Sequence, residues 1–411
     1  MTPRYVTGLG IACALGTGAE TFFRGLADAS RLSALPPSVI TSFDASKYPD
    51  ARVVEVPGFD PTKYLGDKGL RTLDRLTKLL VVAARLCLHD AGFKKDGEWI
   101  ALSPERVGVC CSNAYGSLEA ITELDRVAQL EDARYINPAK FPNTVSNSAS
   151  GYVSIWEDLR ALNVSVSDGN CGGLDAVGCA DVFLETARAD AIITGGGEAM
   201  SEPIFLAFQK LGVLGPVSPL LPAPEAGMVA ARLATNDTRL GEGAAFLALE
   251  DPDVATARGA RVLGMVTGYG TAFVAAEEHA LVFASREAMI RAITSALADA
   301  AIQPQDVDLV VSSVAGLARF DIEELAAIAA VLGEAPVVAP KLALGETLGA
   351  GGAMAMAASL AWLGGAAVPG ALVVRGVTPS AVRTVVVTTI GYYGNASAVV
   401  MRGPGEAAKT R

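Results

Sequence analysis

Short apolar runs alternate along the chain with longer segments in which apolar residues recur at helical spacing. The short runs are rich in Val and Ile, which is typical of strands buried in a sheet. Because strands and helices alternate, the pattern predicts an α/β protein with mostly parallel sheets covered by helices. The predicted strands lie at residues 5–7, 106–111, 165–167, 191–194 and 244–249, and then at 262–269, 309–312, 384–389 and 397–401.

The longer segments with helical spacing predict helices, and the first of them has clear end signals. It opens near Asp74 and stops at Gly92, which suits a helix C-cap. The most apolar later segment, residues 353–374, is interrupted by glycines and a proline, so we expect a buried helix that leads into a strand and no membrane span. The predicted helices occupy residues 73–91, 173–189, 285–301 and 322–332.

The two halves of the chain share one plan without a strict sequence repeat. Each half has an opening strand, a long helix, a further strand and a glycine-rich turn that leads into a buried helix. The turn lies at residues 169–173 in the first half and at 345–352 in the second. A polar break at residues 250–253 predicts a division into units 1–252 and 253–411.

Composition and charge narrow the classes of function. With 51% hydrophobic and 19% charged residues, the 411-residue chain can bury a large core. A net charge of −11 without a Lys/Arg run argues against nucleic acid and against an anionic membrane surface as partners. Six cysteines without a CxxC pair and only two histidines argue against a metal site, and we expect no cofactor. The amino-terminal segment lacks a signal-peptide pattern, which predicts a cytoplasmic protein.

Seven collinear segments, which together span nearly the whole chain, resemble the β-ketoacyl synthase family. They include YVTGLGIACALG near the start, DAIITGGGEAM and GEGAAFLALED in the first half, and TIGYYGNASAVV near the end. The resemblance implies the thiolase fold, in which two pseudo-duplicated halves form a layered α-β-α-β-α core. The similar segments are residues 5–26, 106–123, 136–155, 190–200, 241–251, 266–273 and 389–400.

The resemblance also implies a chemistry that can be checked residue by residue. In this family a cysteine thiolate at a helix N-terminus takes the acyl group, and two histidines assist decarboxylation of the malonyl thioester. The nucleophile block reads like T-A-C-S-S-G-L-D-A, and residues 168–176 read D-G-N-C-G-G-L-D-A here. Aligning the blocks on G-L-D-A places Asn170 at the cysteine position, and an amide cannot carry an acyl thioester.

Both family histidines are replaced as well. Ala315 stands at the first histidine position and Glu346 at the second, while Asp321, Glu324 and Lys341 are retained from the surrounding motifs. The resemblance therefore implies an active-site region that has lost all three reacting groups and kept its scaffold.

The two histidines of the chain lie elsewhere. We expect His89, which falls late in the predicted helix 73–91, and His279, in a connecting segment, to be surface or packing residues.

One branch of the family has this character: the chain length factors of type II polyketide synthases, whose degenerate block typically reads Q-A-G-G-L-D-A. Residues 170–176, N-C-G-G-L-D-A, are similar. The resemblance implies a non-catalytic subunit that forms a heterodimer with an active ketosynthase and shapes its acyl tunnel. An acyl carrier protein would be reached through the complex, because an acidic chain is a poor docking surface for an acidic carrier.

Other positions have a functional and a packing interpretation. Leu118, Ile121 and Asp125 share one helix face, which in the family lies at the subunit interface and bounds the acyl tunnel; ordinary core or interface packing is the alternative. Tyr392 and Tyr393 fall where the family often has a gating aromatic, and loop packing is the alternative.

Two other functions remain open. One is an acyltransferase with altered chemistry that uses Cys171 or Glu346. The alternative interpretations are that Cys171 is a buried cysteine without a catalytic role and that Glu346 forms a salt bridge or hydrogen bond. The other is a protein that binds an acyl chain or an acyl carrier protein by itself.

Overall fold

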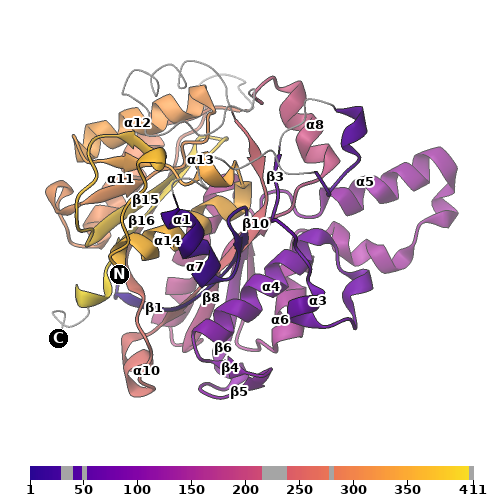
Figure 1. Ribbon diagram of the computed structural model, residues 1–411, viewed down its shortest axis with the longest axis horizontal. Helices are drawn as coiled ribbons and strands as arrows, with labels where there is room; N and C mark the ends of the chain where they lie inside the picture. Colours follow the sequence, from indigo (N-terminus) through magenta and orange to yellow (C-terminus); the bar gives the residue numbers. More distant parts are fainter. Residues whose placement is uncertain (29–39, 49–52, 215–237, 277–281, 407–411) are drawn as a thin grey trace.

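The computed structural model describes residues 1–28, 40–48, 53–214, 238–276 and 282–406. Within these residues a 12-stranded mixed sheet runs through the molecule in the order β14-β13-β12-β15-β16-β11-β1-β10-β8-β6-β7, with β2 beside β1 (Figure 1). Its strands are β1 (Arg4–Cys13), β2 (Gly16–Thr17), β6 (Val107–Ser112), β7 (Asn163–Val166), β8 (Ala191–Glu198), β10 (Gly243–Glu250), β11 (Gly264–Phe273), β12 (Leu309–Val311), β13 (Val337–Val338), β14 (Val373–Arg375), β15 (Thr384–Ile390) and β16 (Asn395–Arg402).

The expectation of mostly parallel sheets is wrong. Strand β1 pairs antiparallel with β10 and β11, and β8–β10, β11–β16 and β15–β16 are antiparallel too. Within the described part of this 12-stranded sheet, parallel pairing is confined to β6 with its neighbours β7 and β8 and to β12 with β13 and β15. Helices cover both faces, so the antiparallel strands β1, β8, β10 and β15 are buried along their whole length, and burial on both faces is usual for parallel strands.

The two halves of the sheet repeat one topology. The first half has the order β7-β6-β8-β10-β1 and the second has β13-β12-β15-β16-β11, which is the same sequence of strands counted along each half. The halves meet where Arg4 and Tyr5 of β1 pair with Val266 and Met265 of β11. We place the division proposed at residue 252 in the connection between β10 and β11, at the start of α10.

The helices form the layers on either side of the sheet. Helices α4 and α6 cover the first half, α11 and α12 cover the second, and α7 and α14 lie between the halves and contact strands of both, which gives the predicted five layers. The helices are α1 (Ala19–Ala27), α3 (Thr62–Leu65), α4 (Arg75–Asp90), α5 (Leu118–Val127), α6 (Ser148–Glu157), α7 (Gly172–Glu185), α8 (Glu202–Lys210), α10 (Pro252–Ala257), α11 (Arg286–Asp299), α12 (Ala318–Leu332), α13 (Lys341–Leu344) and α14 (Gly351–Leu363).

Helix ends follow local signals. The Asp74 side chain accepts the Thr77 N–H at 2.7 Å and caps α4, and Gly92 follows the helix with a φ of +69°. Helix α7 ends at Glu185, four residues before the predicted end, because Ala187 adopts a φ of +52°. His89 lies in the last turn of α4, and His279 lies outside the described residues.

Glycines allow the two central helices to approach each other. A Cβ on Gly173 of α7 would lie 3.0 Å from the Ala353 nitrogen, and one on Gly352 would lie 2.9 Å from Leu174. Every residue of α14 is buried, in agreement with the apolar run seen in the sequence. No helix in the described part of the chain is both long and apolar enough to cross a membrane.

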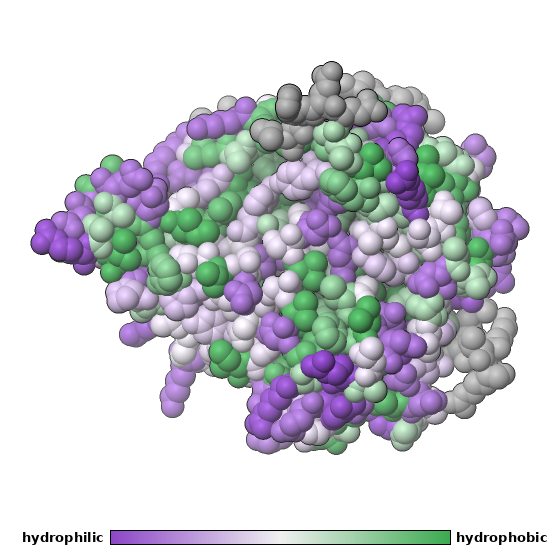
Figure 2. Space-filling model, turned by 180° about the vertical axis from the view of Figure 1, so that it is seen from behind, coloured by the Kyte–Doolittle hydropathy of each residue, from purple (hydrophilic) through white to green (hydrophobic). Residues whose placement is uncertain are grey.

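A projecting segment that begins with α5 carries exposed apolar side chains. Helix α5 and the irregular turns after it extend away from the body, at the right of Figure 1 and at the left in the rear view of Figure 2. Helix α6, which packs against β7, presents Ile155 with 75% of its surface exposed. The projecting segment adds the exposed Leu130, Tyr135, Phe141 and Val145.

Candidate functional site

Asn170 lies in a 3-10 turn directly before α7, where its buried side chain is tied to strand β15. The turn begins at Gly169, whose φ of +57° favours glycine. Asn170 is 2% exposed, and its Nδ2 donates a hydrogen bond to the Ile390 carbonyl at 2.5 Å. Its Oδ1 has no hydrogen-bond partner among the described residues. The amide therefore sits at the N-terminus of a buried helix, where the resemblance puts the nucleophilic thiol.

Cys171, the next residue, is fully buried. Its Sγ donates to the Thr389 carbonyl at 3.4 Å. Burial raises the pKa of this thiol well above its usual range, and the nearby Asp175 and Asp168 raise it further. The thiol therefore keeps its proton, whereas a nucleophilic cysteine needs a lowered pKa.

The first histidine position is occupied by the Ala315 methyl group, and the retained Asp321 holds the surrounding loop. The Ala315 and Gly316 N–H groups donate to the Asp321 carboxyl at 3.2 and 2.8 Å. Burial raises the pKa of Asp321 to about 8, and the nearby Glu324 and Glu346 contribute to the rise. This carboxyl thus holds the backbone of the loop at Ala315 and Gly316 in place, and it is largely protonated at neutral pH.

Glu324 links the same loop to strand β15. Its carboxyl accepts hydrogen bonds from the Ser313 N–H at 2.9 Å, the Ser313 hydroxyl at 2.6 Å and the Thr388 hydroxyl at 2.6 Å. The Ser313 hydroxyl also accepts the Ile390 N–H at 3.1 Å, and the Ile390 carbonyl binds Asn170. A continuous set of hydrogen bonds therefore connects the loop of Ala315 with the turn of Asn170.

Glu346, at the second histidine position, forms a buried ion pair. The Lys341 Nζ donates to its two carboxylate oxygens at 2.7 and 2.8 Å, and the Leu348 N–H donates to Oε1 at 2.8 Å. Both partners of the pair are almost completely buried. We call Asn170, Asp321, Glu324, Lys341 and Glu346 the polar centre.

Glu198 is a buried acid near the polar centre that the sequence analysis missed. It ends strand β8 and accepts the Ala114 N–H at 2.8 Å and the Gly349 N–H at 3.3 Å. Burial raises its pKa to about 7, and the nearby charge of Glu346 contributes. The available signal was an acidic residue at the end of the otherwise apolar and glycine-rich run 191–198.

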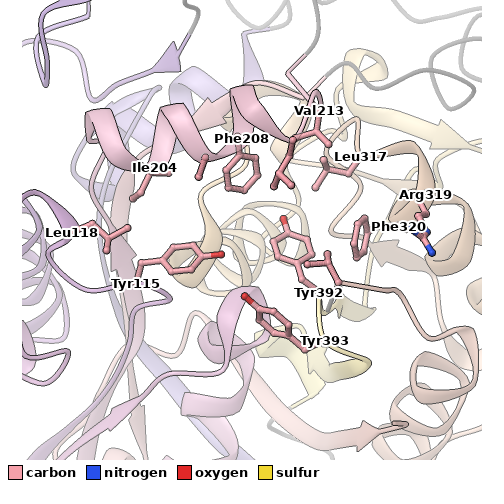
Figure 3. Close-up of a pocket in the computed structure, with 13 residues that line it drawn as sticks. Tyr115, Leu118, Ile204, Phe208, Val213, Leu317, Arg319, Phe320, Tyr392 and Tyr393 are labelled. Carbon is pink, nitrogen blue, oxygen red and sulfur yellow. The ribbon is translucent and has the colours of Figure 1, made fainter. Parts of the chain in front are cut away.

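A separate apolar cavity of about 370 Å³ lies beside the polar centre (Figure 3). Tyr115, Tyr392 and Tyr393 line it together with Leu118 at the start of α5, and we call it the tyrosine cavity. Ile204, Ala207, Phe208, Leu211, Val213, Val282, Leu317, Arg319 and Phe320 complete the lining among the described residues.

The structure brings together some of the expected tunnel and gate residues and not others. Leu118, Tyr392 and Tyr393 meet in the tyrosine cavity. Ile121 is 38% exposed, and Asp125 accepts a hydrogen bond from Gln129 at 3.1 Å on the surface of α5. The contribution of Tyr115 and of the α8 and α12 residues was missed, because aromatic residues far apart in sequence give no local signal that they share a cavity.

The described part of the chain contains no cluster of three or more His, Cys, Asp or Glu side chains with metal-binding geometry. The six cysteines are free, and all except the half-buried Cys179 are buried.

Comparison with known proteins identifies matches along most of the chain. Residues 3–255 match the family model "Beta-ketoacyl synthase, N-terminal domain" and residues 263–375 match "Beta-ketoacyl synthase, C-terminal domain". The chain is 30% identical to the "Putative polyketide beta-ketoacyl synthase 2" of Streptomyces coelicolor over 97% of this chain and 94% of that protein. It is 28% identical to a 3-oxoacyl-[acyl-carrier-protein] synthase 2 of Coxiella burnetii over 85% of this chain and 83% of the relative.

Solved structures share the fold at low sequence identity. The ishigamide ketosynthase/chain length factor superposes with a TM-score of 0.83 at 24% identity, covering 98% of this chain and 99% of that one. A ketosynthase in complex with a type II polyketide synthase acyl-carrier protein gives a TM-score of 0.76 at 22% identity, covering 98% of this chain and 99% of that chain.

Proposed function

Since the chain belongs to the beta-ketoacyl synthase family, we propose that it is the non-catalytic, chain-length-factor-like subunit of a ketosynthase pair in polyketide or fatty-acyl elongation. The observation that carries this proposal is Asn170, a buried amide at the helix N-terminus where the family has its thiolate. An amide can neither attack an acyl thioester nor hold the acyl group during elongation.

The other two positions support the same proposal. Condensation by decarboxylation uses imidazoles that transfer protons and stabilise an enolate. Here a methyl group and a carboxylate stand in their place, and the carboxylate is already bound to the Lys341 ammonium. A negative charge at Glu346 would repel a developing enolate, so the polar centre suits a structural role.

A partner surface is available at the outer edge of β7 and on the exposed side of α6. Strand β7 ends the sheet, so its outer edge has no neighbouring strand among the described residues. An open edge next to exposed apolar side chains invites pairing with another chain. Ile155 of α6 and Phe141 of the projecting segment are such side chains. We propose that the active ketosynthase docks on this face, and that the acyl carrier protein is reached through the complex.

The alternative of an altered acyltransferase has less support. Cys171 is fully buried with a raised pKa, and Glu346 is held in an ion pair. A second candidate function, binding of an acyl chain by this subunit alone, is favoured by one observation, the largely apolar tyrosine cavity.

The test is co-expression with an intact Cys–His–His ketosynthase encoded in an adjacent reading frame, followed by native mass spectrometry. We expect a one-to-one complex in which intact-mass analysis after incubation with acyl thioesters finds the acyl group on the partner. Acylation of this chain that is lost in Cys171→Ser would favour the altered acyltransferase, and a stable homodimer that ignores the ketosynthase would refute the proposal.

A pair of matched variants locates the interface. Ile155→Asp places a charge beside β7, and Val377→Asp places one after β14, at the opposite end of the sheet, where Val377 is 90% exposed. We expect the first variant to weaken the complex by about tenfold or more and the second to leave it unchanged.

A further inference from the structure

A buried carboxyl group at the start of α7 joins the two halves of the chain. Asp175 lies in the first turn of α7, and its Oδ1 accepts hydrogen bonds from the Tyr269 hydroxyl of β11 at 2.8 Å and from the Ser397 hydroxyl of β16. Helix α7 comes from the first half of the chain, whereas β11 and β16 come from the second. Asp175 is 9% exposed, so the connection between the halves lies in the interior.

Asp168, directly before the turn that carries Asn170, supplies a second carboxyl group. Its side chain forms a hydrogen bond with the Asp175 carboxyl. A carboxylate has no hydrogen to donate, so two carboxyl groups form a hydrogen bond only when one of them is protonated. The backbone carbonyl of Asp168 also accepts the Asn395 Nδ2 of β16 at 3.3 Å. A proton between the two carboxyl groups therefore ties this turn to α7, beside its contact with β16.

The proton of this pair is held within the physiological pH range. Burial raises the pKa of Asp175 to about 7, and the hydrogen bond with Asp168 adds to the rise, whereas the hydrogen bonds from Ser397 and Tyr269 lower it. Once the proton is lost, two carboxylates face each other at hydrogen-bonding distance in a site that is largely shielded from water. Like charges so placed repel each other, which makes the closed arrangement unfavourable.

The other ionisable groups around the pair keep one protonation state through this range. Burial raises the pKa of Tyr269, so this phenol keeps its proton. Burial also raises the pKa of the Cys171 and Cys179 thiols above the usual value of 9.0. The Lys341 ammonium, whose charge acts on Cys171, is bound to Glu346. A change of charge near neutral pH in this cluster therefore comes from the two carboxyl groups.

We propose that Asp168 and Asp175 form a pH-sensitive carboxyl clamp between the halves of the chain. With one proton between the two carboxyl groups, the clamp holds the turn at residues 168–171 against α7. At higher pH the loss of this proton releases the turn, which carries Asn170 and Cys171 at the N-terminal end of the buried helix. The clamp is independent of the proposed pairing with a ketosynthase, because all its groups belong to this chain.

The test is amide hydrogen–deuterium exchange of residues 165–176 in the purified full-length chain at pH 6 and pH 8.5, with each rate corrected for the exchange rate of an unfolded peptide at that pH. The closed turn keeps the proton up to a pH of about 7, whereas in the opened turn Asp175 returns to its usual pKa of 3.8. The one pH unit between 6 and 7 then makes opening about tenfold more frequent at pH 8.5 than at pH 6. Equal protection at the two pH values would overturn the clamp.

A matched pair of variants separates the clamp from other buried acids. Asp168→Asn removes the second charge, and the introduced amide can donate to an ionised Asp175, so the change in protection between pH 6 and pH 8.5 should fall to about twofold or less. Asp67→Asn alters an exposed carboxyl and should keep the tenfold change of the parent chain. A tenfold change that persists in Asp168→Asn would refute the clamp.

Tyr269→Phe tests the clamp without removing either carboxyl group. The Tyr269 hydroxyl lowers the pKa of Asp175, so its loss should move the pH at which the turn opens upward, by about 0.5–1 pH unit. A purely structural role of Tyr269 would change the protection of the turn equally at every pH. An opening pH that stays where it is in the parent chain would contradict the direct contact of this hydroxyl with the clamp.

Discussion

The polar centre and the tyrosine cavity are neighbours with opposite designs. In the polar centre most functional groups are bound to other groups of the same chain, as in the Lys341–Glu346 pair and the hydrogen bonds of Glu324. In the tyrosine cavity about 370 Å³ of space is open between largely apolar walls.

This difference shows where a ligand can be accommodated. A polar group that already makes its hydrogen bonds within the chain gains little free energy by binding a substrate. Moving it breaks those hydrogen bonds, which is unfavourable in a buried site. An open space has the reverse balance, because a ligand can enter it without displacing bonded groups. The region that resembles an active centre by sequence is therefore the more self-contained of the two, and the capacity for binding lies beside it.

The largest effect should come from breaking the ion pair of the polar centre. Lys341→Met removes the ammonium and leaves the buried Glu346 carboxylate without its main partner. We expect the free energy of unfolding, measured by urea titration, to fall by about 3–5 kcal/mol. Adding Glu346→Leu to this variant should restore much of the loss, because the buried charge is then removed as well.

An exposed ion pair provides the matched control for this variant. Arg291 and Glu287 form a pair one helical turn apart, with 58% and 59% of their side chains exposed. Arg291→Met should therefore change the free energy of unfolding by about 0–1 kcal/mol. Losses of similar size in Lys341→Met and Arg291→Met would contradict the view that the polar centre is held together by its internal pairs.

An effect spread over several pH units is expected from the buried acids. The pKa of Asp321 rises from 3.8 to about 8 on folding, so between about pH 4 and 8 the folded chain binds a proton that the unfolded chain releases. The free energy of unfolding should therefore fall as the pH rises through this range, by up to about 1.4 kcal/mol per pH unit for one group. Glu198, with a pKa of about 7, acts in the same direction.

Asp321→Asn tests the origin of this pH dependence. The amide cannot ionise, so urea unfolding at pH 5.5 and pH 8.5 should give a smaller difference in the variant than in the parent chain. The same difference in both would mean that Asp321 does not titrate as its burial implies.

The smallest effect is expected in the wall of the cavity. Phe320→Ala removes a half-buried ring that already borders open space, so we expect a loss of about 1–2 kcal/mol in thermal or urea unfolding. Phe205→Ala, at a ring that is 1% exposed and packed on Phe43, should cost about 3–5 kcal/mol. Equal costs would indicate that the cavity is closed by packing in solution.

Local features of the fold could be predicted from the sequence. The nine expected strands all occur, and Asp74 and Gly92 mark the ends of α4, because strand composition and cap chemistry act over a few residues. Strand direction could not be predicted, because β1 is paired with strands from distant parts of the chain. The hydrophobic pattern indicates which residues are buried, but it does not indicate whether a strand runs parallel or antiparallel to its neighbours.

In the candidate site, too, local features could be predicted from the sequence and contacts between distant segments could not. The replacements at Asn170, Ala315 and Glu346 are visible in the sequence, and Lys341 and Glu346 are only five positions apart. That these two side chains form a buried pair depends on the turn around Gly345, which has a φ of +77°. The tyrosine cavity combines β6, α5, α8, α12 and the loop after β15, and a linear pattern cannot predict such an assembly.

The position of β1 in the middle of the sheet has a consequence for biosynthesis. Tyr5 pairs with Glu250 and Arg4 pairs with Val266, so β1 leaves the ribosome long before its partner strands β10 and β11 are made. Until then a strand that the folded protein buries completely has open edges, which is the condition under which nascent chains recruit chaperones or aggregate. Fragments that end before residue 243 should therefore be insoluble even where they contain most of the first half.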